Sequence, residues 1–362
     1  MSVIETPSTT TAASAPVAHR RRTTRIRMIE LLVLVAVLVI ALALSIAVGS
    51  RLMSLPTVWD ALWANTSVPW ANAAARGTDA YGIVHQLRIP RTILGLLAGL
   101  ALGAAGALAQ GHTRNPLADP GILGVNAGAA CAVVVGVYVL NIATPIQYMG
   151  FGLVGALITS ALVFVVASAA RGSSPLLLVL AGTGLNAMLL AITSAIVLVD
   201  SASLDAWRFW NVGSISGRGT DVIWAALPFI AIGLVLAVAN GYFLNALSLG
   251  DDLSTALGTR VATTRFLGLL ALTILAGAAT AACGPIAFLG LLAPHIARYL
   301  VGPDYRWIVP FAALIGADLL LLCDVIGRVI ARPGEIYVGI MVSVIGAPFL
   351  IALVRRRKLV AV

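Results

Sequence analysis

The chain has 362 residues, of which 60% are hydrophobic and only 10% are charged, and its mean hydropathy is +1.01. This composition excludes a soluble enzyme and is typical of an all-α protein that crosses the membrane many times. The net charge is +9, but the basic residues lie at the ends of apolar segments, which favours lipid headgroups over nucleic acid as the partner.

The N-terminal residues 1–27 are rich in Ser, Thr, Ala and Pro and end in a cluster of arginines. Because this composition cannot bury a core, we expect a disordered, basic tail on the cytoplasmic side. The apolar run 28–49 is too long for a signal-peptide core, and no clear small-x-small cleavage site precedes Arg51. It is therefore predicted to be a retained first span, and a single transmembrane domain is expected over 28–354.

The next segment, 51–87, carries Trp59, Trp63 and Trp70. Indole rings suit the boundary between membrane and water, so this segment is predicted to lie outside the cytoplasm and to contain a short amphipathic helix.

The stretch 88–130 joins two glycine-rich apolar segments through a short polar hinge. Pro90 can open a helix at its first position, and the uncharged run 92–109 is about 27 Å long as a helix, enough to cross a bilayer. Four glycines in this run form one small-residue stripe along which another helix can approach closely; they are Gly95, Gly99, Gly103 and Gly106.

The apolar runs predict about ten transmembrane helices. Charge supports an even number, because the arginine-rich N-terminal tail and the basic tail 355–362 are then both cytoplasmic. The eighth run contains Pro285 and Pro294 and is short, so it is expected to be partly re-entrant. The predicted spans are 28–49, 90–110, 121–140, 148–170, 175–199, 222–247, 263–281, 285–301, 307–329 and 336–354.

The chain offers no familiar active site, cofactor site or metal site. Its four histidines are scattered, and its three cysteines lie apart in apolar surroundings. A phosphate-binding loop needs Gly-Lys-Ser/Thr, but the only lysine, Lys358, precedes Leu359. The chain is therefore predicted not to be an enzyme, and any ATP-driven transport would need a separate ATPase subunit.

Two blocks of motifs carry a family resemblance. The first runs from Arg88-x-Pro90-Arg91 through Gln110 and the segment 115–120 to Leu123-Gly124; the second comprises 284–291, Pro294-His295-x-x-Arg298, Gly302-x-Asp304-x-Arg306, Asp324-x-x-x-Arg328, Glu335 and 346–348. In this order they resemble the FecCD/BtuC-type permease subunits of bacterial ABC importers for ferric siderophores, haem or cobalamin. The resemblance covers most of the chain from 88 to 354.

The resemblance implies a BtuC-like permease fold in the bacterial cytoplasmic membrane, with both termini cytoplasmic. It also implies three kinds of protein partner: two ABC ATPase subunits, an extracytoplasmic solute-binding protein and a second permease subunit, identical or related. Ferric siderophore is the favoured cargo and makes the chain a component of iron transport. Haem or cobalamin stays open, because the helix patterns do not separate them.

The same family docks its ATPase on a cytoplasmic segment that corresponds here to 249–260, expected as a pair of short helices with glycines at the turns. Gly250 and Gly258 fit that pattern, whereas Ser254 stands where alanine is expected. The ATPase-coupling residues implied are Gly250, Ser254, Leu257 and Gly258. Without the resemblance, a solvated loop kept soluble by its aspartates would be the simpler interpretation.

Two further sets of site residues are predicted. Asn115 and Leu117 lie at the hinge between the second and third spans, where the resemblance implies a cytoplasmic gate. Arg88, Arg91 and Arg328 lie at extracytoplasmic span ends, against the positive-inside trend, so they are predicted to receive carboxylates of the solute-binding protein; capping of helix ends and contact with lipid phosphates are the simpler alternative.

Two carboxylates within a predicted span, Asp318 and Asp324, leave a different class of protein open. A proton-coupled secondary transporter would use such groups. Asp324 and Arg328 are four residues apart, however, and can neutralise each other on one helix face, which is the preferred interpretation. A carrier without an ATPase therefore ranks below the ABC permease.

Overall fold

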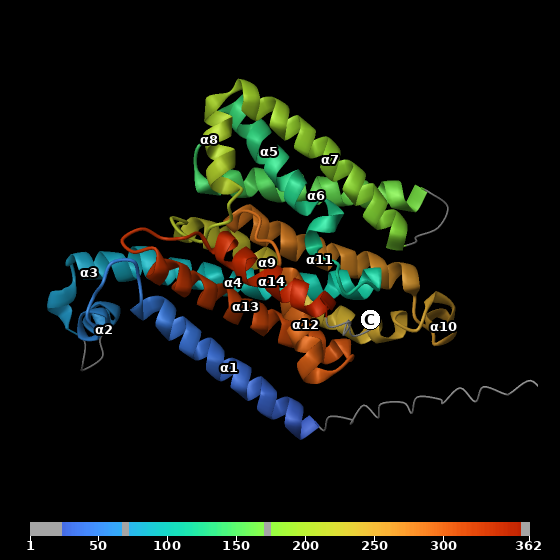
Figure 1. The fold of residues 1–362 in the computed structure, drawn as a ribbon, viewed down its shortest axis with the longest axis horizontal. Helices are drawn as coiled ribbons and strands as arrows, with labels where there is room; N and C mark the ends of the chain where they lie inside the picture. Colours follow the sequence, from blue (N-terminus) through green and yellow to red (C-terminus); the bar gives the residue numbers. More distant parts are fainter. Residues whose placement is uncertain (1–23, 67–71, 170–174, 356–362) are drawn as a thin grey trace, which may run out of the picture.

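A computed structural model describes residues 24–66, 72–169 and 175–355, and these residues form helices with no β-strand. Seven of the helices are long and apolar enough to cross a membrane, and three shorter apolar helices accompany them in the described part of the chain. Together they match the ten predicted spans, and the polytopic all-helical fold is confirmed (Figure 1).

The helices pack side by side in one elongated bundle (Figure 1). Their bounds are α1 (Thr24–Ala47), α2 (Leu55–Trp63), α3 (Asp79–Gly82), α4 (Ile89–Thr113), α5 (Val125–Leu140), α6 (Pro145–Ala169), α7 (Pro175–Val199), α8 (Ser201–Trp210), α9 (Thr220–Leu247), α10 (Asp251–Ala256), α11 (Val261–Cys283), α12 (Leu289–Val301), α13 (Tyr305–Ile330) and α14 (Val338–Arg355). Two 3₁₀ helices, η1 (Ala73–Ala75) and η3 (Pro120–Leu123), and one π-helix, η2 (Ile83–Arg88), complete the helices of the described residues.

Helix α4 lies at the centre of the fold and is buried along nearly its whole length. The predicted glycine stripe faces its neighbours: a Cβ on Gly99 would collide with the backbone of Ala317, and one on Gly103 with the carbonyl of Ala312, both on α13. A Cβ on Gly106 would collide with the carbonyl of Gly290 on α12. The stripe therefore brings three helices to backbone contact, where close van der Waals packing stabilises their association.

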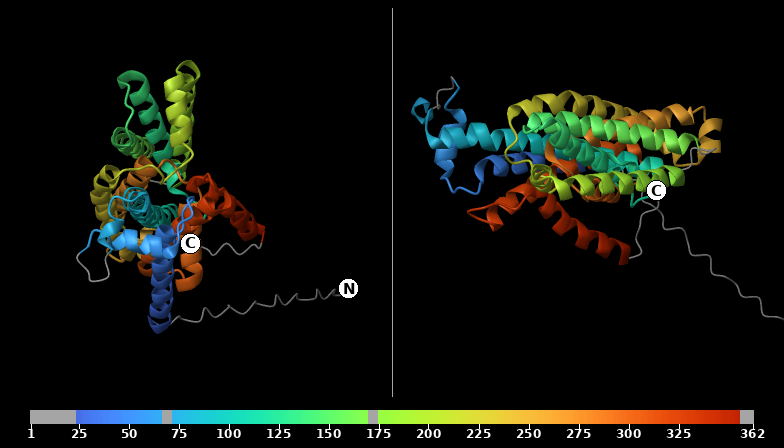
Figure 2. Two further views of the ribbon diagram at one scale, coloured as in Figure 1. Left: turned by 90° about the vertical axis from the view of Figure 1, so that its left-hand side faces the viewer. Right: turned by 90° about the horizontal axis from the view of Figure 1, so that it is seen from above.

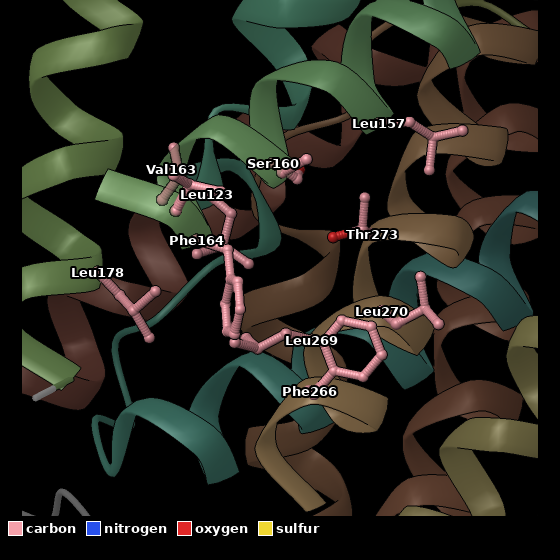
Figure 3. Close-up of a pocket in the computed structure, with 12 residues that line it drawn as sticks. Leu123, Leu157, Ser160, Val163, Phe164, Leu178, Phe266, Leu269, Leu270 and Thr273 are labelled. Carbon is pink, nitrogen blue, oxygen red and sulfur yellow. The ribbon is translucent and has the colours of Figure 1, made fainter. Parts of the chain in front are cut away.

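Helices α5, α6, α7 and α8 form a separate group beside this core, drawn in green to yellow-green at the top of Figure 1 and standing above the rest of the bundle in the left view of Figure 2. Gly128 of α5 and Gly155 of α6 allow these two helices to touch at their backbones. Helix α6 also packs on α11 of the core. Between α6, α7 and α11 lies an apolar cavity of about 300 Å³, lined by side chains that include Phe164, Leu178 and Phe266 (Figure 3).

Different short helices mark the two ends of the bundle. Helix α10 lies at one end, the α10 end, and α2 and α3 lie at the other, the α2 end (Figure 1). At the α10 end, Arg27 of α1 donates to the carbonyl of Val301 and lies within 3.8 Å of Asp304. Helix α1 presents Leu32, Val33 and other apolar side chains outward, as a lipid-facing span would.

Some element boundaries differ from the predictions. Helix α1 begins at Thr24, so Arg25 and Arg27 belong to the helix and not to a disordered tail; residues 1–23 and 356–362 lie outside the described residues. The short helix predicted in 51–87 is present as α2, where the ring centroids of Trp59 and Trp63 lie 5.7 Å apart with their planes tilted by 57°. Trp70 lies outside the described residues.

The predicted eighth span corresponds to α12, which has only 13 residues. Residues 284–288 are not helical, so the helix begins after Pro285, while Pro294 lies within the helix and does not interrupt it. Proline is tolerated there because neighbouring elements of the bundle surround it.

Candidate functional sites at the two ends of the bundle

A network of buried charged groups at the α2 end is built around Asp324 of α13, whose side chain is fully buried. Arg91 of α4 donates from Nη2 to the Asp324 carboxylate at 2.6 Å and from Nε at 3.1 Å. Arg328, one helical turn along α13, lies 2.8 Å from the other carboxylate oxygen. The predicted pairing of Asp324 with Arg328 is confirmed, and Arg91 adds a second cation to it.

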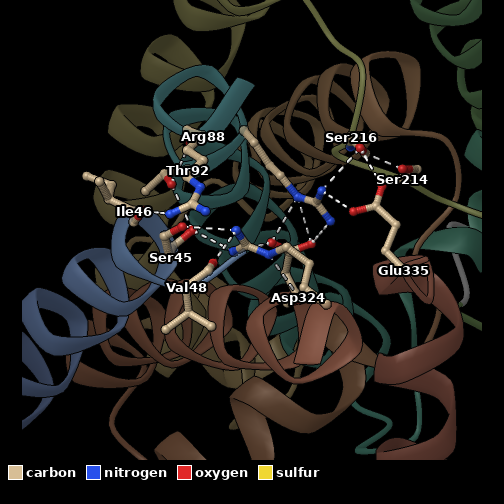
Figure 4. Close-up of polar contacts among 11 residues, drawn as sticks. Ser45, Ile46, Val48, Arg88, Thr92, Ser214, Ser216, Asp324 and Glu335 are labelled. Carbon is tan, nitrogen blue, oxygen red and sulfur yellow. Dashed lines mark hydrogen bonds and ion pairs between the residues drawn. The ribbon is translucent and has the colours of Figure 1, made fainter. Parts of the chain in front are cut away.

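The network continues to the loop before α14. Arg91 donates to Glu335 at 2.6 Å, and the Ser216 hydroxyl donates to the other oxygen of that carboxylate at 2.6 Å (Figure 4). Burial raises the pKa of Glu335, but the hydrogen bonds from Ser216 and Arg91 outweigh it and hold the pKa below its ordinary value. Glu335 is therefore ionised at neutral pH and joins the loops before α9 and α14 to α4.

Arginines also cap the C-terminal end of α1, where the last carbonyl groups of a helix lack partners within the helix. Arg88 donates to the carbonyls of Ile46 and Ala47, each at 2.8 Å. Arg328 donates to those of Ser45 and Val48 at 3.0 and 2.9 Å. The cations therefore lie against the negative end of the helix dipole and fix α1 to the core.

The structure thus brings the three arginines predicted for docking into one cluster, but it turns them inward. The exposed fractions of Arg88, Arg91 and Arg328 are 4%, 9% and 2%, and all three have partners within the chain. The alternative that they cap helix ends is borne out for Arg88 and Arg328. Docking of a solute-binding protein at this cluster stays a prediction.

At the α10 end, α10 is a single helix and not the pair of helices expected. Gly250 and Gly258 bound it with positive φ angles of 106° and 82°, a region in which side chains with a Cβ are strained. Ser254 is fully buried, and its hydroxyl donates to the carbonyls of Ala246 and Gly250. A serine in place of alanine therefore fastens α10 to the end of α9.

The outer surface of α10 and its flanks is apolar. Leu249, Leu253 and Leu257 have exposed fractions of 56%, 58% and 66%. A short helix with exposed leucines at the tip of the molecule is suited to bind in a cleft of another protein, because burying each leucine there would contribute about 1.5–3 kcal/mol.

Asp251 connects α10 to two other helices. Its carboxylate accepts from Arg114 at 2.6 Å and from Arg265 of α11 at 2.9 Å. Arg114, which ends α4 with a φ of 49°, also donates to the carbonyl of Leu247. The sequence predicted an ATPase-coupling segment here and named no partner for Asp251, so this Arg114–Asp251–Arg265 cluster was not predicted.

The two predicted gate residues directly follow Arg114. The Asn115 side chain accepts a hydrogen bond from the backbone N–H of Leu117 at 2.9 Å, which closes a tight turn. Leu117 has an exposed fraction of 40% and lies on the surface of the single chain. Assignment of these residues to a gate stays a prediction.

Within residues 24–66, 72–169 and 175–355, no three His, Cys, Asp or Glu side chains lie close enough together to hold a metal ion. Cys131, Cys283 and Cys323 are free and buried, as expected for packing residues.

Comparison with known proteins identifies the family. The model of the FecCD transport family matches residues 37–356, nearly the whole described chain. The chain belongs to the FecCD transport family. The predicted resemblance is thereby confirmed, and with it an integral membrane permease of the ABC importer class.

Two permease proteins resemble the chain over most of their length. The ferric enterobactin transport system permease protein of Escherichia coli (strain K12) is 49% identical over 276 residues, 76% of this chain and 82% of that protein. The Fe(3+)-citrate import system permease protein of Bacillus subtilis (strain 168) is 40% identical over 282 residues, 78% of this chain and 84% of that protein.

A solved structure shares the fold. A chain of a metal-chelate type ABC transporter in an inward-facing conformation matches with a TM-score of 0.78 at 26% identity, over 91% of this chain and 99% of that chain.

Proposed function

We propose that this protein is the permease subunit of an ATP-driven importer for ferric siderophores. The observation that carries the proposal is the 49% identity to a ferric enterobactin permease, together with relatives named for iron citrate and iron hydroxamate. These names favour iron chelates over haem or cobalamin as the cargo. The permease provides a path and performs no covalent chemistry, and a separate subunit hydrolyses ATP.

An ABC ATPase subunit is proposed to bind at α10. The exposed leucines and the glycine-bounded geometry of α10 support this docking, since a rigid short helix can follow the motion of a cleft that holds it. The contact of Asp251 with Arg114 offers a route for that motion, because Arg114 ends the central helix α4 immediately before Asn115 and Leu117. These two residues are proposed to form a cytoplasmic gate with their copies in a second permease subunit.

A solute-binding protein is proposed to dock at the α2 end, where Arg88, Arg91 and Arg328 lie. Since these guanidinium groups already have internal partners, docking there would require carboxylates of the binding protein to compete with Glu335 or with backbone carbonyls. In this orientation the α10 end, where α1 begins, faces the cytoplasm.

The test is reconstitution of the complete importer. Permease, ATPase and solute-binding protein in proteoliposomes should accumulate a radioactive ferric siderophore only when ATP is present on the ATPase side. Accumulation by the permease alone, driven by a proton gradient, would contradict the proposal and support a secondary transporter.

A further inference from the structure

A second cavity at the α2 end has not been used by the function described so far. It has a volume of about 430 Å³, within the range of small-molecule sites, and lies between α8, the start of α6 and the loops before α9 and α14. Its walls combine four aromatic rings, two serines, one arginine and one aspartate; the residues of this α8 cavity are Tyr148, Ala202, Asp205, Ala206, Phe209, Trp210, Ser214, Ser216, Arg218 and Tyr337.

Arg218 supplies an uncompensated positive charge to the α8 cavity. Its Nε atom is buried without a hydrogen-bond partner, and no carboxylate in the described part of the chain forms an ion pair with it. Asp205, the acid in the cavity wall, pairs with Arg208 at 2.8 Å, and nearby Glu335 pairs with Arg91. Burial lowers the pKa of Arg218, because the residues that the structure describes supply no carboxylate that would offset the loss of water around its charge.

Aromatic side chains line the α8 cavity and offer flat faces on which a ring of a ligand can stack. Tyr148 of α6, Phe209 and Trp210 of α8 and Tyr337 before α14 line it from three directions. Trp210 is 2% exposed, and its indole N–H has no hydrogen-bond partner in the described residues. A buried N–H donor without a partner is costly, and a ligand with acceptor oxygens would remove that cost.

These observations point to one class of ligand. A guanidinium group binds anionic oxygens through charge-assisted hydrogen bonds, and aromatic rings stack on other rings. We propose that the α8 cavity binds an anionic iron chelate through its aromatic, catecholate-type oxygens, with Arg218 as the residue that recognises the charge. This inference rests on the proposed function and adds to it a selectivity for anionic aromatic chelates over neutral ones.

Direct binding tests the inference without ATP. The full-length permease in lipid nanodiscs is dialysed against two radioactive probes, a trianionic ferric tricatecholate and a neutral ferric trihydroxamate. Arg218→Gln should weaken tricatecholate binding about tenfold or more and leave trihydroxamate binding unchanged. Arg218→Lys should retain most of the tricatecholate affinity, since it keeps the charge. Arg51→Gln is the matched control, because Arg51 is an exposed arginine of the same end, outside the cavity.

The outcomes separate this inference from the proposed function. Unchanged tricatecholate binding in Arg218→Gln, equal weakening of both probes, or no tricatecholate binding by the unmodified permease would each overturn the assignment of the cavity. ATP-driven uptake by the complete importer is measured in parallel. If that uptake persists while the cavity assignment fails, the proposed function stands; if no iron chelate is taken up at all, the proposed function fails.

Discussion

The two ends of the bundle handle charge in opposite ways. At the α2 end, Asp324 and its arginines are removed from solvent and satisfied inside the protein. At the α10 end, the side chain of Asp251 is 45% exposed although it also pairs with two arginines. A buried ion pair is costly to break, whereas an exposed pair exchanges readily with water. The comparison indicates that the α2 end holds the helices in place and that the α10 end is free to respond to a partner.

The largest effect is expected from breaking the buried network. Asp324→Ala leaves Arg91 and Arg328 buried without their counter-ion and should reduce the free energy of unfolding by about 3–5 kcal/mol. Thermal unfolding in detergent measures this loss. Asp205→Ala removes an exposed pair and should cost less than about 1 kcal/mol. Equal losses in the two variants would remove the distinction between buried and exposed pairs.

The next effect concerns the apolar surface of α10. Leu257→Asp should weaken binding of the ATPase subunit at least about tenfold, because a charge would enter a desolvated contact. Co-purification and titration with the ATPase measure the affinity. Leu52→Asp changes an equally exposed leucine near the α2 end and should leave that affinity unchanged. If both variants bind the ATPase normally, α10 is not its docking element.

A smaller effect on stability, with a distinct effect on transport, is expected for Asp251→Asn. Because the Asp251 side chain is 45% exposed, the free energy of unfolding should fall by less than in Asp324→Ala, although Arg265, whose side chain is 8% exposed, loses a charged partner. The amount of iron imported per ATP hydrolysed should fall, since Arg114 and Arg265 lose their shared anion. Both quantities are measured in proteoliposomes. A normal ratio of transport to hydrolysis would show that this contact does not carry the coupling.

The smallest effect is a pH dependence that arises from Glu335. Its pKa is lowered in the folded protein, so its stabilising contribution is complete above the unfolded value, near 4.5, and is lost as the pH falls through the folded pKa. Between pH 7 and 5 the contribution should be constant, and it should decline at lower pH. Unfolding temperatures of the unmodified chain and of Glu335→Gln should therefore converge in acid. A constant difference across the acid range would contradict this assignment.

The sequence predicted local features well. Hydropathy located the spans, because each corresponds to one apolar helix, and helical spacing predicted the pairing of Asp324 with Arg328. Long-range partners could not be predicted in the same way. Arg91 and Asp324 are 233 positions apart, and nothing in either segment alone indicates that α4 and α13 place them together.

The same limit applies to the site residues, whose partners within the chain the sequence does not reveal. Arginines at span ends looked available for a partner because the sequence does not reveal that the carbonyls at the end of α1 lie beside Arg88 and Arg328. The Arg114–Asp251–Arg265 cluster was not predicted for the same reason, since Asp251 of α10 contacts residues at the end of α4 and on α11. The unpaired charge of Arg218 became visible only once its neighbours were known.

The central claim is that nucleotide at the α10 end changes the cytoplasmic mouth of the permease, and one measurement tests it most directly. In the complete importer, the rate of thiol labelling of Leu117→Cys is compared with and without ATP; the three native cysteines are buried and serve as an internal background. We expect labelling to change severalfold between the two states, because the residue lies beside the turn that Arg114 connects to α10. Identical labelling in both states, with active ATP hydrolysis, would contradict the account.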